Sequence, residues 1–559
     1  MVQCDKTLIQ YTVVRDEMLN FDREINPYPM PRYMQFGKNG MVATSQNLAA
    51  AAGAEMLRKG GNAVDAAIAT AACLSVVEPV SNGIGSDAFA LIWFNGELHG
   101  LNSSGPAPMS LSIEAVKKAG YDSMPEHGFI PITVPGAPAA WAALSEKFGK
   151  LSLSECLKPA IDYADNGYPI SPVLGTAWKH VYHMYKTDLN GEEFTPWFDT
   201  FTFNDKPPEV GQVVKLPYHA ETLREIGKTK AKSFYNGAIS DEITSFCKKH
   251  GGFITKEDLQ NFTPEWVNPI SVNYRGYDVW EMPPNGQGIV ALMTLNVLKD
   301  FEFENKDNAG TYHKQFEAIK LAFASGKKYV TDPRFMSITS EEMLSDEFTA
   351  KMRAKITDKA AQPEIKSPNS GGTVYLATAD GDGNMVSFIQ SNYKWFGSGI
   401  VIPGTGIALQ NRGFDFSLDS NHINHLKGGK RTYHTIIPGF LTKGDKAIGP
   451  FGVMGGYMQP QGHVQVVMNT VDFELNPQAA LDAPRWQWVG DKVFEIERHF
   501  ESTNSSKRII EELESKGHNI KMQSKSESFG RGQIIWRDSA NGVLMGGCES
   551  RADSTIACF

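Results

Sequence analysis

Thr373 and Ser391 are two hydroxyl residues that a short hairpin would place side by side. Residues 373–379 read TVYLATA and residues 385–391 read MVSFIQS, both rich in strand formers. The intervening DGDGN is typical of a tight turn, so the two runs predict an antiparallel hairpin. Counting outward from a turn near Asp382 and Gly383 sets Thr373 opposite positions 391–392. The paired hydroxyls could support a nucleophile if a base came within reach, although Thr373 could equally be an ordinary strand residue.

Two further groups of residues could take part in such chemistry. Gly455 and Gly456 are adjacent glycines whose N–H groups could approach an oxyanion without hindrance from a Cβ, or they could form an ordinary tight turn. Arg412 and Asp415 stand close together in LQNRGFD, residues 409–415. We expect this pair either to bind a substrate or to form a structural ion pair.

Helices and strands that would position these residues follow from composition and periodicity. An Ala-rich stretch over 45–77 predicts two helices with a break at 60–62, and a strand is expected over 87–94. Further helices are expected from the 140s to 164, over 312–329 and over 462–470. The polar stretch 351–370, with Pro363 and Pro368, predicts an exposed loop ahead of Thr373. The chain after the hairpin is glycine-rich and β-like up to Gly413.

The bulk properties exclude several classes of protein. The 559 residues carry 54 basic and 63 acidic side chains, a net charge of −9 that argues against nucleic acid as a partner. We find no signal-peptide pattern and no run of about 20 apolar residues, so we expect a cytoplasmic protein without a membrane partner. The six cysteines are scattered, which predicts buried thiols. His, Asp and Glu do not fall at metal-ligand spacing, so no metal or other cofactor is expected.

Several motifs in fixed order resemble the γ-glutamyltransferases, a family of N-terminal nucleophile hydrolases. They are GGNAVDAAIA (60–69), EPVSNGIGS (78–86), VPGAPAAW (134–141), GGTVYLATADGDGNMVSFIQS (371–391), MGGYMQPQGH (454–463) and NPQAALDAPRW (476–486). The resemblance covers the chain from about Gly40 to its end. It implies a four-layer αββα sandwich and self-cleavage between Gly372 and Thr373. The products would be a large subunit, 1–372, and a small subunit, 373–559, intertwined in one body that could itself dimerise.

The resemblance also assigns catalytic roles. Thr373 would attack the substrate carbonyl, with its own freed α-amine as base. An α-amine has a pKa of about 8, low enough for this task near neutral pH. Ser391 falls where the family usually has a second threonine that supports the nucleophile. Gly455 and Gly456 match the pair that forms the oxyanion hole, and Asp415 matches the acid that holds a substrate's α-amino group.

The expected substrate pocket departs from the family at five positions. Ser104 stands where the family has the arginine that clamps the substrate's α-carboxylate, and a serine cannot make a bidentate charged contact. Tyr393 replaces an asparagine, Arg412 replaces Glu or Gln, and His434 and Thr435 replace a Ser-Ser pair.

The motifs LQNRG, YHTIIPGF and MQPQGH look like the branch that includes oxamate amidohydrolase and cephalosporin acylase-like members. We therefore expect hydrolysis of a small acid amide resembling oxamate. A true γ-glutamyltransferase is the first alternative. An uncleaved, inactive member with a binding role is the second.

Overall fold

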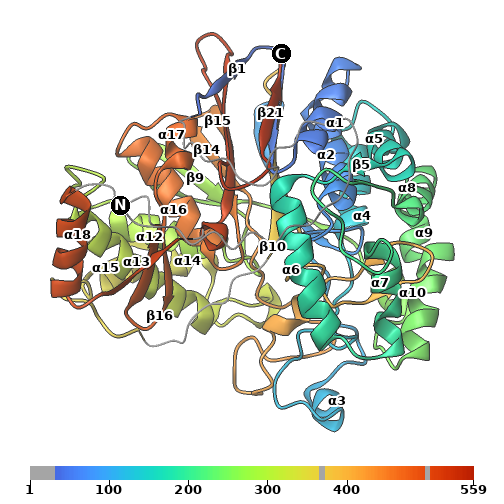
Figure 1. Ribbon diagram of the computed structural model, residues 1–559. Coiled ribbons are helices and arrows are strands. Elements are labelled where there is room, and N and C mark those ends of the chain that lie inside the picture. The colour runs from blue at the N-terminus through green and yellow to red at the C-terminus, as the bar shows by residue number, and fades with distance from the viewer. Residues whose placement is uncertain (1–31, 364–371, 498–503, 525) are drawn as a thin grey trace, which may run out of the picture.

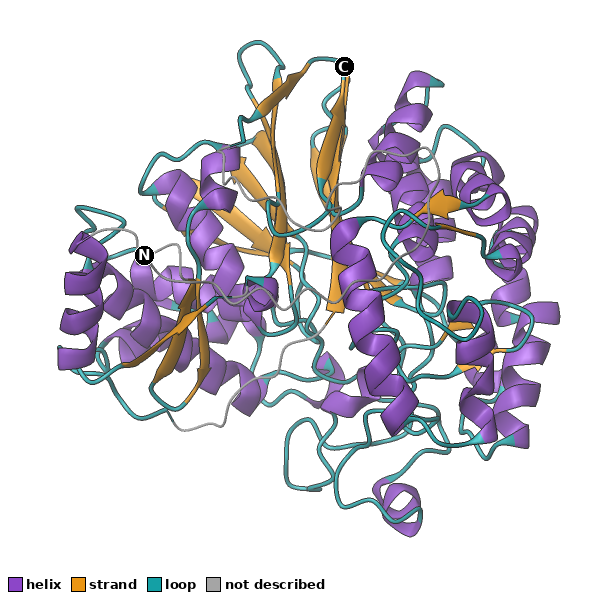
Figure 2. Ribbon diagram, in the orientation of Figure 1, coloured by secondary structure: helices purple, strands orange, loops and turns teal. Residues whose placement is uncertain are grey.

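The computed structural model describes residues 32–363, 372–497, 504–524 and 526–559. Residues 364–370 of the expected loop, Gly371 and the first 31 residues, with Cys4, lie outside the described residues. Two seven-stranded sheets pack face to face, with helices on their outer faces (Figures 1 and 2). The expected αββα sandwich is thus confirmed. No helix in the described ranges is long and apolar enough to cross a membrane.

One sheet contains the hairpin that carries Thr373. Its order is β21 (Thr555–Cys558), β2 (Gly40–Thr44), β10 (Gly372–Asp380), β11 (Met385–Tyr393), β3 (Asp87–Phe94), β4 (Glu97–Ser103) and β7 (Glu265–Val267). The two hairpin strands therefore lie between β2 and β3, which come from the region before the expected cleavage point.

The other sheet carries the glycine pair at the end of one strand. Its order is β1 (Gln35–Gly37), β20 (Leu544–Cys548), β19 (Arg531–Arg537), β15 (Lys446–Met454), β14 (Gly439–Lys443), β9 (Tyr277–Glu281) and β8 (Ile270–Tyr274). Gly455 and Gly456 directly follow β15, where the chain turns into α16 (Met458–Val471).

Three apolar cores separate the four layers. The first joins the hairpin sheet to α1 (Asn47–Arg58), α2 (Ala63–Val77) and the helices of the right-hand lobe in Figure 1. The second lies between the sheets, and the third joins the other sheet to α12 (Gly288–Leu298), α13 (Ala309–Tyr329) and α16. Burial of these apolar faces is the main force that holds the layers together.

Helices of the right-hand lobe enclose the first core. The larger ones are α4 (Ala137–Phe148), α5 (Leu153–Asn166), α6 (Pro172–Asp188), α8 (Pro217–Thr229) and α10 (Ala238–Lys249). The helical segment expected from the 140s to 164 is confirmed and consists of two helices, α4 and α5. Ser152 ends the break by capping α5 with its side chain, and Glu155 completes the capping box.

Alternation along the strands decides which side chains face the second sheet. On β10, Tyr375 and Ala377 lie in the core between the sheets, whereas Val374 and Leu376 face the helices. By the same period of two, Thr373, Ser391 and Asp87 belong to the face toward the second sheet. All three stand at one end of adjacent strands, so this end of the sandwich is where the chemistry can assemble.

Other sequence predictions were only partly correct. The expected loop from Lys351 begins inside α15 (Asp346–Arg353), and the chain before Gly413 holds only the two-residue strands β12 (Val401–Ile402) and β13 (Ile407–Ala408). Tertiary contacts override weak local preferences in both places. Cys73, Cys156, Cys247 and Cys548 are buried free thiols as expected, but Cys558 is half-buried because it lies on edge strand β21.

Candidate active site

Thr373 and Ser391 meet around the carbonyl group of Gly372. The Thr373 hydroxyl donates to Gly372 O at 2.6 Å, and the Ser391 hydroxyl donates to the same oxygen at 2.8 Å. The two Oγ atoms lie 3.1 Å apart. Strands β10 and β11 bring them together because a bulge between Gly372 and Val374 shifts the register at this point. The contact predicted from the hairpin is confirmed.

A buried carboxylate, Asp87, lies directly opposite Ser391 on the neighbouring strand β3. His434 Nε2 lies 3.0 Å from Asp87 Oδ2, while its Nδ1 accepts from the Ile436 N–H. The hydrogen on the ring therefore sits on Nε2 and is donated to Asp87. Burial raises the pKa of Asp87 to about 7, partly offset by Arg412, and burial together with Arg412 lowers the pKa of His434.

Arg412 is the buried cation of this cluster, and its partners differ from those that the sequence suggested. Its Nη1 donates to Thr435 Oγ1 at 2.6 Å, and its Nε lies 3.7 Å from Asp87 Oδ2. The guanidinium also stacks at 4.2 Å from the ring centroid of Tyr393. The predicted ion pair between Arg412 and Asp415 is therefore wrong. Arg412 pairs with Asp87 instead, because the start of β3 brings this carboxylate closer.

Two N–H groups of Arg412 lack a hydrogen-bond acceptor within the described part of the chain. Nε and Nη2 are buried and have no hydrogen-bond partner among the described residues. Burying such donors is costly unless something accepts from them. A planar pair of N–H groups is the arrangement that a carboxylate accepts best.

Asp415 is held by two tyrosine hydroxyls. Tyr393 and Tyr457 both donate to Asp415 Oδ1, at 2.9 and 3.0 Å. The second oxygen, Oδ2, is buried without a partner in the described part of the chain. Tyr393 adopts a left-handed backbone with φ of 75°, a strained conformation that aims its ring under Arg412 and its hydroxyl at Asp415.

Gly455 and Gly456 form the tight connection between β15 and α16. Their φ values of 135° and 58° lie in the region that favours glycine. Gln287 fixes this turn, because its Nε2 donates to Gly456 O at 2.9 Å and to Thr435 O at 2.6 Å. Among the described residues, neither glycine N–H has an acceptor, so both donors stay free to bind an oxyanion.

Ser104 follows the last residue of β4 and is buried in an amide network. Its hydroxyl donates to Asn102 Oδ1 at 2.8 Å and accepts from Asn285 at 3.3 Å. Arg431 Nε donates to the Ser104 carbonyl oxygen at 2.8 Å, while its Nη1 pairs with Glu265 at 2.6 Å. An arginine thus reaches Ser104 from another segment, but Glu265 already balances its charge.

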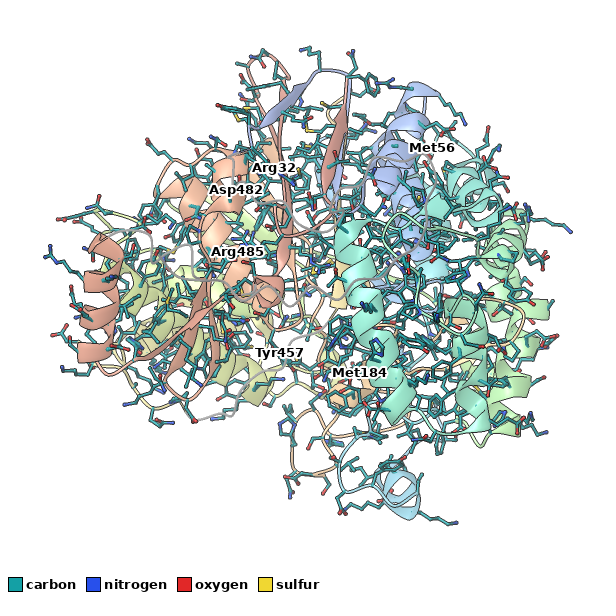
Figure 3. All side chains as sticks on the ribbon, in the orientation of Figure 1. Arg32, Met56, Met184, Tyr457, Asp482 and Arg485 are labelled. Carbon is teal, nitrogen blue, oxygen red and sulfur yellow. The ribbon has the colours of Figure 1, made fainter. Side chains whose placement is uncertain are left out.

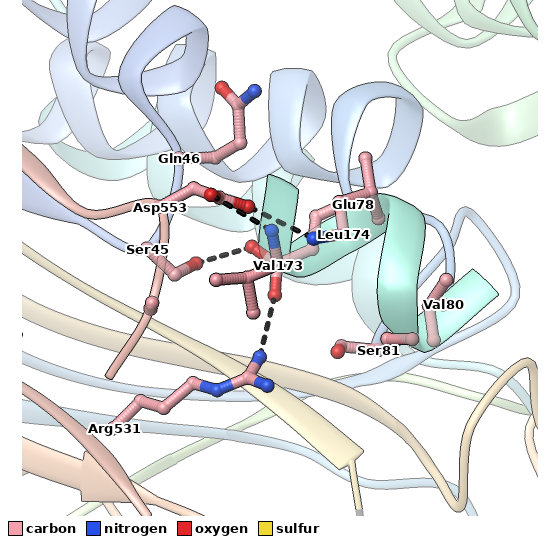
Figure 4. Close-up of a pocket in the computed structure, with 11 residues that line it drawn as sticks. Ser45, Gln46, Glu78, Val80, Ser81, Val173, Leu174, Arg531 and Asp553 are labelled. Carbon is pink, nitrogen blue, oxygen red and sulfur yellow. Dashed lines mark hydrogen bonds and ion pairs between the residues drawn. The ribbon is translucent and has the colours of Figure 1, made fainter. Parts of the chain in front are cut away.

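A small cavity lies near the hairpin and is lined by residues that include Ser45, Glu78 and Arg531 (Figure 4). Ser81 lines it, and a Cβ added to Gly372 would lie 3.6 Å from Ser81 Cα. Inside it, Glu78 accepts from Ser45 at 2.5 Å and lies 3.7 Å from Arg531. Burial raises the pKa of Glu78 to about 7. The EPVSNGIGS motif therefore shapes the wall beside the hairpin.

One cluster of possible metal ligands, His313, Glu317 and His518, was not predicted from the sequence. In the described ranges, His313, Glu317 and His518 bring one ligand atom each within 4.8 Å of one another, and the first two stand four apart on α13. The Lys320 ammonium lies 2.6 Å from Glu317 Oε1, and His313 and His518 hydrogen-bond each other at 2.8 Å. These contacts already balance the charge, so the cluster does not favour a cation.

Sequence reasoning missed several residues of the site, above all Asp87, Gln287 and Tyr457. Tyr457 could have been noticed, because it directly follows the glycine pair. Asp87 could not, since its role depends on the pairing of β3 with β11. Arg485, Arg551 and Asp553 lie in structural networks. Asp553 accepts from the N-terminal N–H groups of α6, and Glu549 pairs with both arginines.

The comparison with known families decides the identity. The gamma-glutamyltranspeptidase model matches residues 49–559. The chain belongs to this family. Its members in the comparisons are N-terminal nucleophile hydrolases, and the fold described above is theirs.

Three relatives of this family member span nearly its whole length. The glutathione hydrolase-like YwrD proenzyme of Bacillus subtilis is 36% identical, over 92% of this chain and 98% of its own. The oxamate amidohydrolase proenzyme of Klebsiella pneumoniae is 30% identical, over 93% and 98%. The crystal structure of cephalosporin acylase from Bacillus halodurans is 58% identical, covers 97% of this chain and 99% of its own, and has a TM-score of 0.93.

Proposed function

We propose that this family member is a self-processing threonine amidohydrolase that cuts itself before Thr373 and then hydrolyses small acid amides through an acyl-enzyme. The observation that carries the proposal is the geometry around Gly372, where both hydroxyls contact one carbonyl oxygen. The proenzyme names of the two curated relatives support it.

Self-cleavage would begin with attack of Thr373 Oγ on the Gly372 carbonyl carbon. The hydroxyl proton passes to the Thr373 nitrogen as the C–N bond breaks, so this nitrogen becomes a free amine while Gly372 is held as an ester on Thr373 Oγ. Water then hydrolyses the ester, which releases the Gly372 carboxylate and restores the hydroxyl. Ser391 assists, because its hydrogen bond to Gly372 O stabilises the negative charge that develops there.

Turnover would use the same hydroxyl on a substrate amide. The freed amine of Thr373 accepts the hydroxyl proton and passes it to the leaving amine, and water later resolves the ester. The free N–H groups of Gly455 and Gly456 would bind the oxyanion of each tetrahedral intermediate.

The substrate class follows from Arg412. Its two unpartnered N–H groups stand in a cluster that also holds Asp87, directly opposite Ser391. A small acid amide with its carboxylate near the reacting carbonyl, as in oxamate, would accept from both donors. The oxamate amidohydrolase relative supports this substrate, and the cephalosporin acylase neighbour favours a second candidate, removal of an acyl group from a cephalosporin-type amine.

Two experiments test the proposal. Mass analysis of purified protein should show fragments that begin at Thr373, and Thr373→Ala should remain a single chain without activity. Ammonia release from oxamate should exceed hydrolysis of γ-glutamyl-p-nitroanilide. A stable uncut chain would establish the inactive alternative, and efficient use of the γ-glutamyl substrate without oxamate turnover would establish the γ-glutamyltransferase.

A further inference from the structure

Lys327 brings a second cation to the substrate side of the site. It lies near the end of α13 and the residue as a whole is half-buried. Burial of the ammonium group lowers the pKa of Lys327 to about 8, partly offset by the charge of Asp415, so the lysine is mostly charged at neutral pH. Its Nζ donates to the hydroxyl of Tyr457 and lies 4.0 and 4.3 Å from the ring centroids of Tyr457 and Tyr433. These aromatic faces attract a cation and fix its position.

Tyr457 connects this ammonium group to Asp415. The tyrosine, labelled near the middle of Figure 3, accepts from Lys327 and donates to Asp415 Oδ1 at 3.0 Å. Only one hydroxyl group therefore separates the lysine from the carboxylate. The buried and unpartnered Oδ2 of Asp415 is the atom that a substrate ammonium would approach. Such a group would arrive beside a positive charge that the protein already supplies.

The charges around the site favour an anion over a zwitterion. Arg412 and Lys327 are the cations, and Asp415 and Asp87 are the carboxylates. Burial raises the pKa of Asp87 to about 7, so near neutral pH this carboxyl is only partly ionised. A ligand that adds a third cation is repelled, whereas a carboxylate meets two unpartnered N–H groups of Arg412.

We propose that Lys327 supplies from within the protein the ammonium group that Asp415 would otherwise take from a substrate. The site would thus select acyl groups that lack an α-amino group. This selectivity rests on the proposed function. It adds the chemical feature by which the site would recognise its acyl group, namely the absence of an α-amino group. Lys327 would act as a specificity residue and take no part in the chemical steps at Thr373.

Glutarate and L-glutamate provide a matched pair of probes, because they differ only in the α-amino group. Their dissociation constants should be measured by calorimetry on the wild type, Lys327→Met and Lys327→Arg. Lys328→Met is the control, since Lys328 is the next residue on α13 but is exposed and lies over Tyr329. Thermal melting of each variant reports its folding.

We expect the wild type to bind glutarate at least tenfold more tightly than L-glutamate. Lys327→Met should reduce this preference at least tenfold, while Lys327→Arg and Lys328→Met keep it. The ratio of kcat/KM for glutaryl- and γ-glutamyl-p-nitroanilide should change in the same direction. An unchanged ratio in Lys327→Met, a wild type that prefers L-glutamate, or no binding of either acid overturns the inference.

Failure of the proposed function would look different from failure of this inference. A chain that does not cut itself or hydrolyse amides would contradict the catalytic proposal, yet the two binding constants could still be compared. Conversely, an active amidohydrolase whose ligand preference ignores Lys327 would leave the chemistry of Thr373 intact and remove only the role of the lysine.

Discussion

At the scale of single residues, the chemistry centres on one carbonyl oxygen. Gly372 O accepts from Thr373 and Ser391, and each hydroxyl can be tested separately because they occupy different strands. Ser391 also accepts from the Tyr393 N–H at 2.8 Å, which fixes its orientation. Its hydroxyl is therefore positioned to act as a donor during self-cleavage.

Ser391→Ala should slow self-cleavage by roughly 10²-fold, the loss typical of one oxyanion donor. Ser391→Thr should cleave normally because it keeps the hydroxyl. Time courses on denaturing gels measure both rates. Ser387→Ala is the control, since Ser387 lies on the same strand but bonds Tyr375. Equal rates in Ser391→Ala and the wild type would show that the serine is only structural.

Arg412→Gln should raise KM for oxamate roughly 10- to 100-fold, with a smaller effect on kcat. The change removes charged hydrogen bonds, each worth about 1.5–3 kcal/mol. Steady-state assays of ammonia release measure it. Arg224→Gln, which removes an exposed arginine paired with Asp165, should change nothing. If KM is unaffected, Arg412 serves only to neutralise the negative charge of Asp87.

At the scale of elements, the turn from β15 to α16 is where backbone conformation matters most. Gly455 has a φ of 135°, and a Cβ there would lie 3.1 Å from Gly530 Cα. Gly530, the residue just before β19, therefore leaves little room for a side chain. A substitution would displace the N–H groups that we assign to the oxyanion of the substrate.

Gly455→Ala should lower kcat by roughly 10²- to 10³-fold. Self-cleavage should persist, because there the donor to Gly372 O is Ser391. Persistent cleavage would also show that the variant folds. Gly444→Ala is the matched control, since Gly444 has a φ of 59° in the β14–β15 turn with open space around it. Parallel loss of cleavage and turnover would mean that both reactions use the glycine pair.

At the scale of the whole molecule, the two expected subunits share both sheets. Strands β10 and β11 of the small subunit lie between β2 and β3 of the large one, and β21 pairs on the far side of β2. Separating the chains would break five ladders among the described strands, β2–β10, β3–β11, β2–β21, β9–β14 and β1–β20, and would expose all three apolar cores. We therefore expect the cut protein to elute as one species in gel filtration and to separate only on unfolding.

A buried charge network ties the C-terminal region to the second sheet. Glu549 lies between Arg485 and Arg551, at 2.7 and 2.6 Å, and accepts from the Gly532 N–H at 2.7 Å. Although burial opposes it, the two arginines hold the pKa of Glu549 down to about 2. The ionised carboxylate therefore stabilises the folded state above its ordinary pKa of 4.5, and this contribution is lost as pH falls toward 2.

Glu549→Gln should cost about 3–5 kcal/mol of stability at pH 7, because it leaves two buried arginines short of a partner. The difference in the free energy of unfolding between wild type and variant should shrink as pH falls from 4.5 toward 2. Urea unfolding at pH 7 and pH 3 measures it. Glu347→Gln, at an exposed pair with Lys351, should show no such difference. If this difference does not depend on pH, the lost stability comes from altered packing and not from the lost charge.

The sequence by itself determined the features that depend on short stretches of chain. The hairpin set Thr373 beside Ser391, because a period of two and a tight turn act within 20 residues. The break at 60–62 is likewise local, with Asn62 capping α2. The glycine pair was recognisable because two adjacent glycines allow positive φ values without a Cβ in the way.

Only the tertiary structure decided which charges meet. Asp87 and His434 are 347 positions apart, and Lys327 and Tyr457 are 130 apart. Their contacts exist because two sheets stack and α13 packs beside α16, which no local pattern reveals. Burial then sets the charge of each group, so Arg412 pairs with Asp87 and Lys327 reaches toward Asp415. The sequence placed Thr373 beside Ser391, and the packing of the layers determined the charges that surround them.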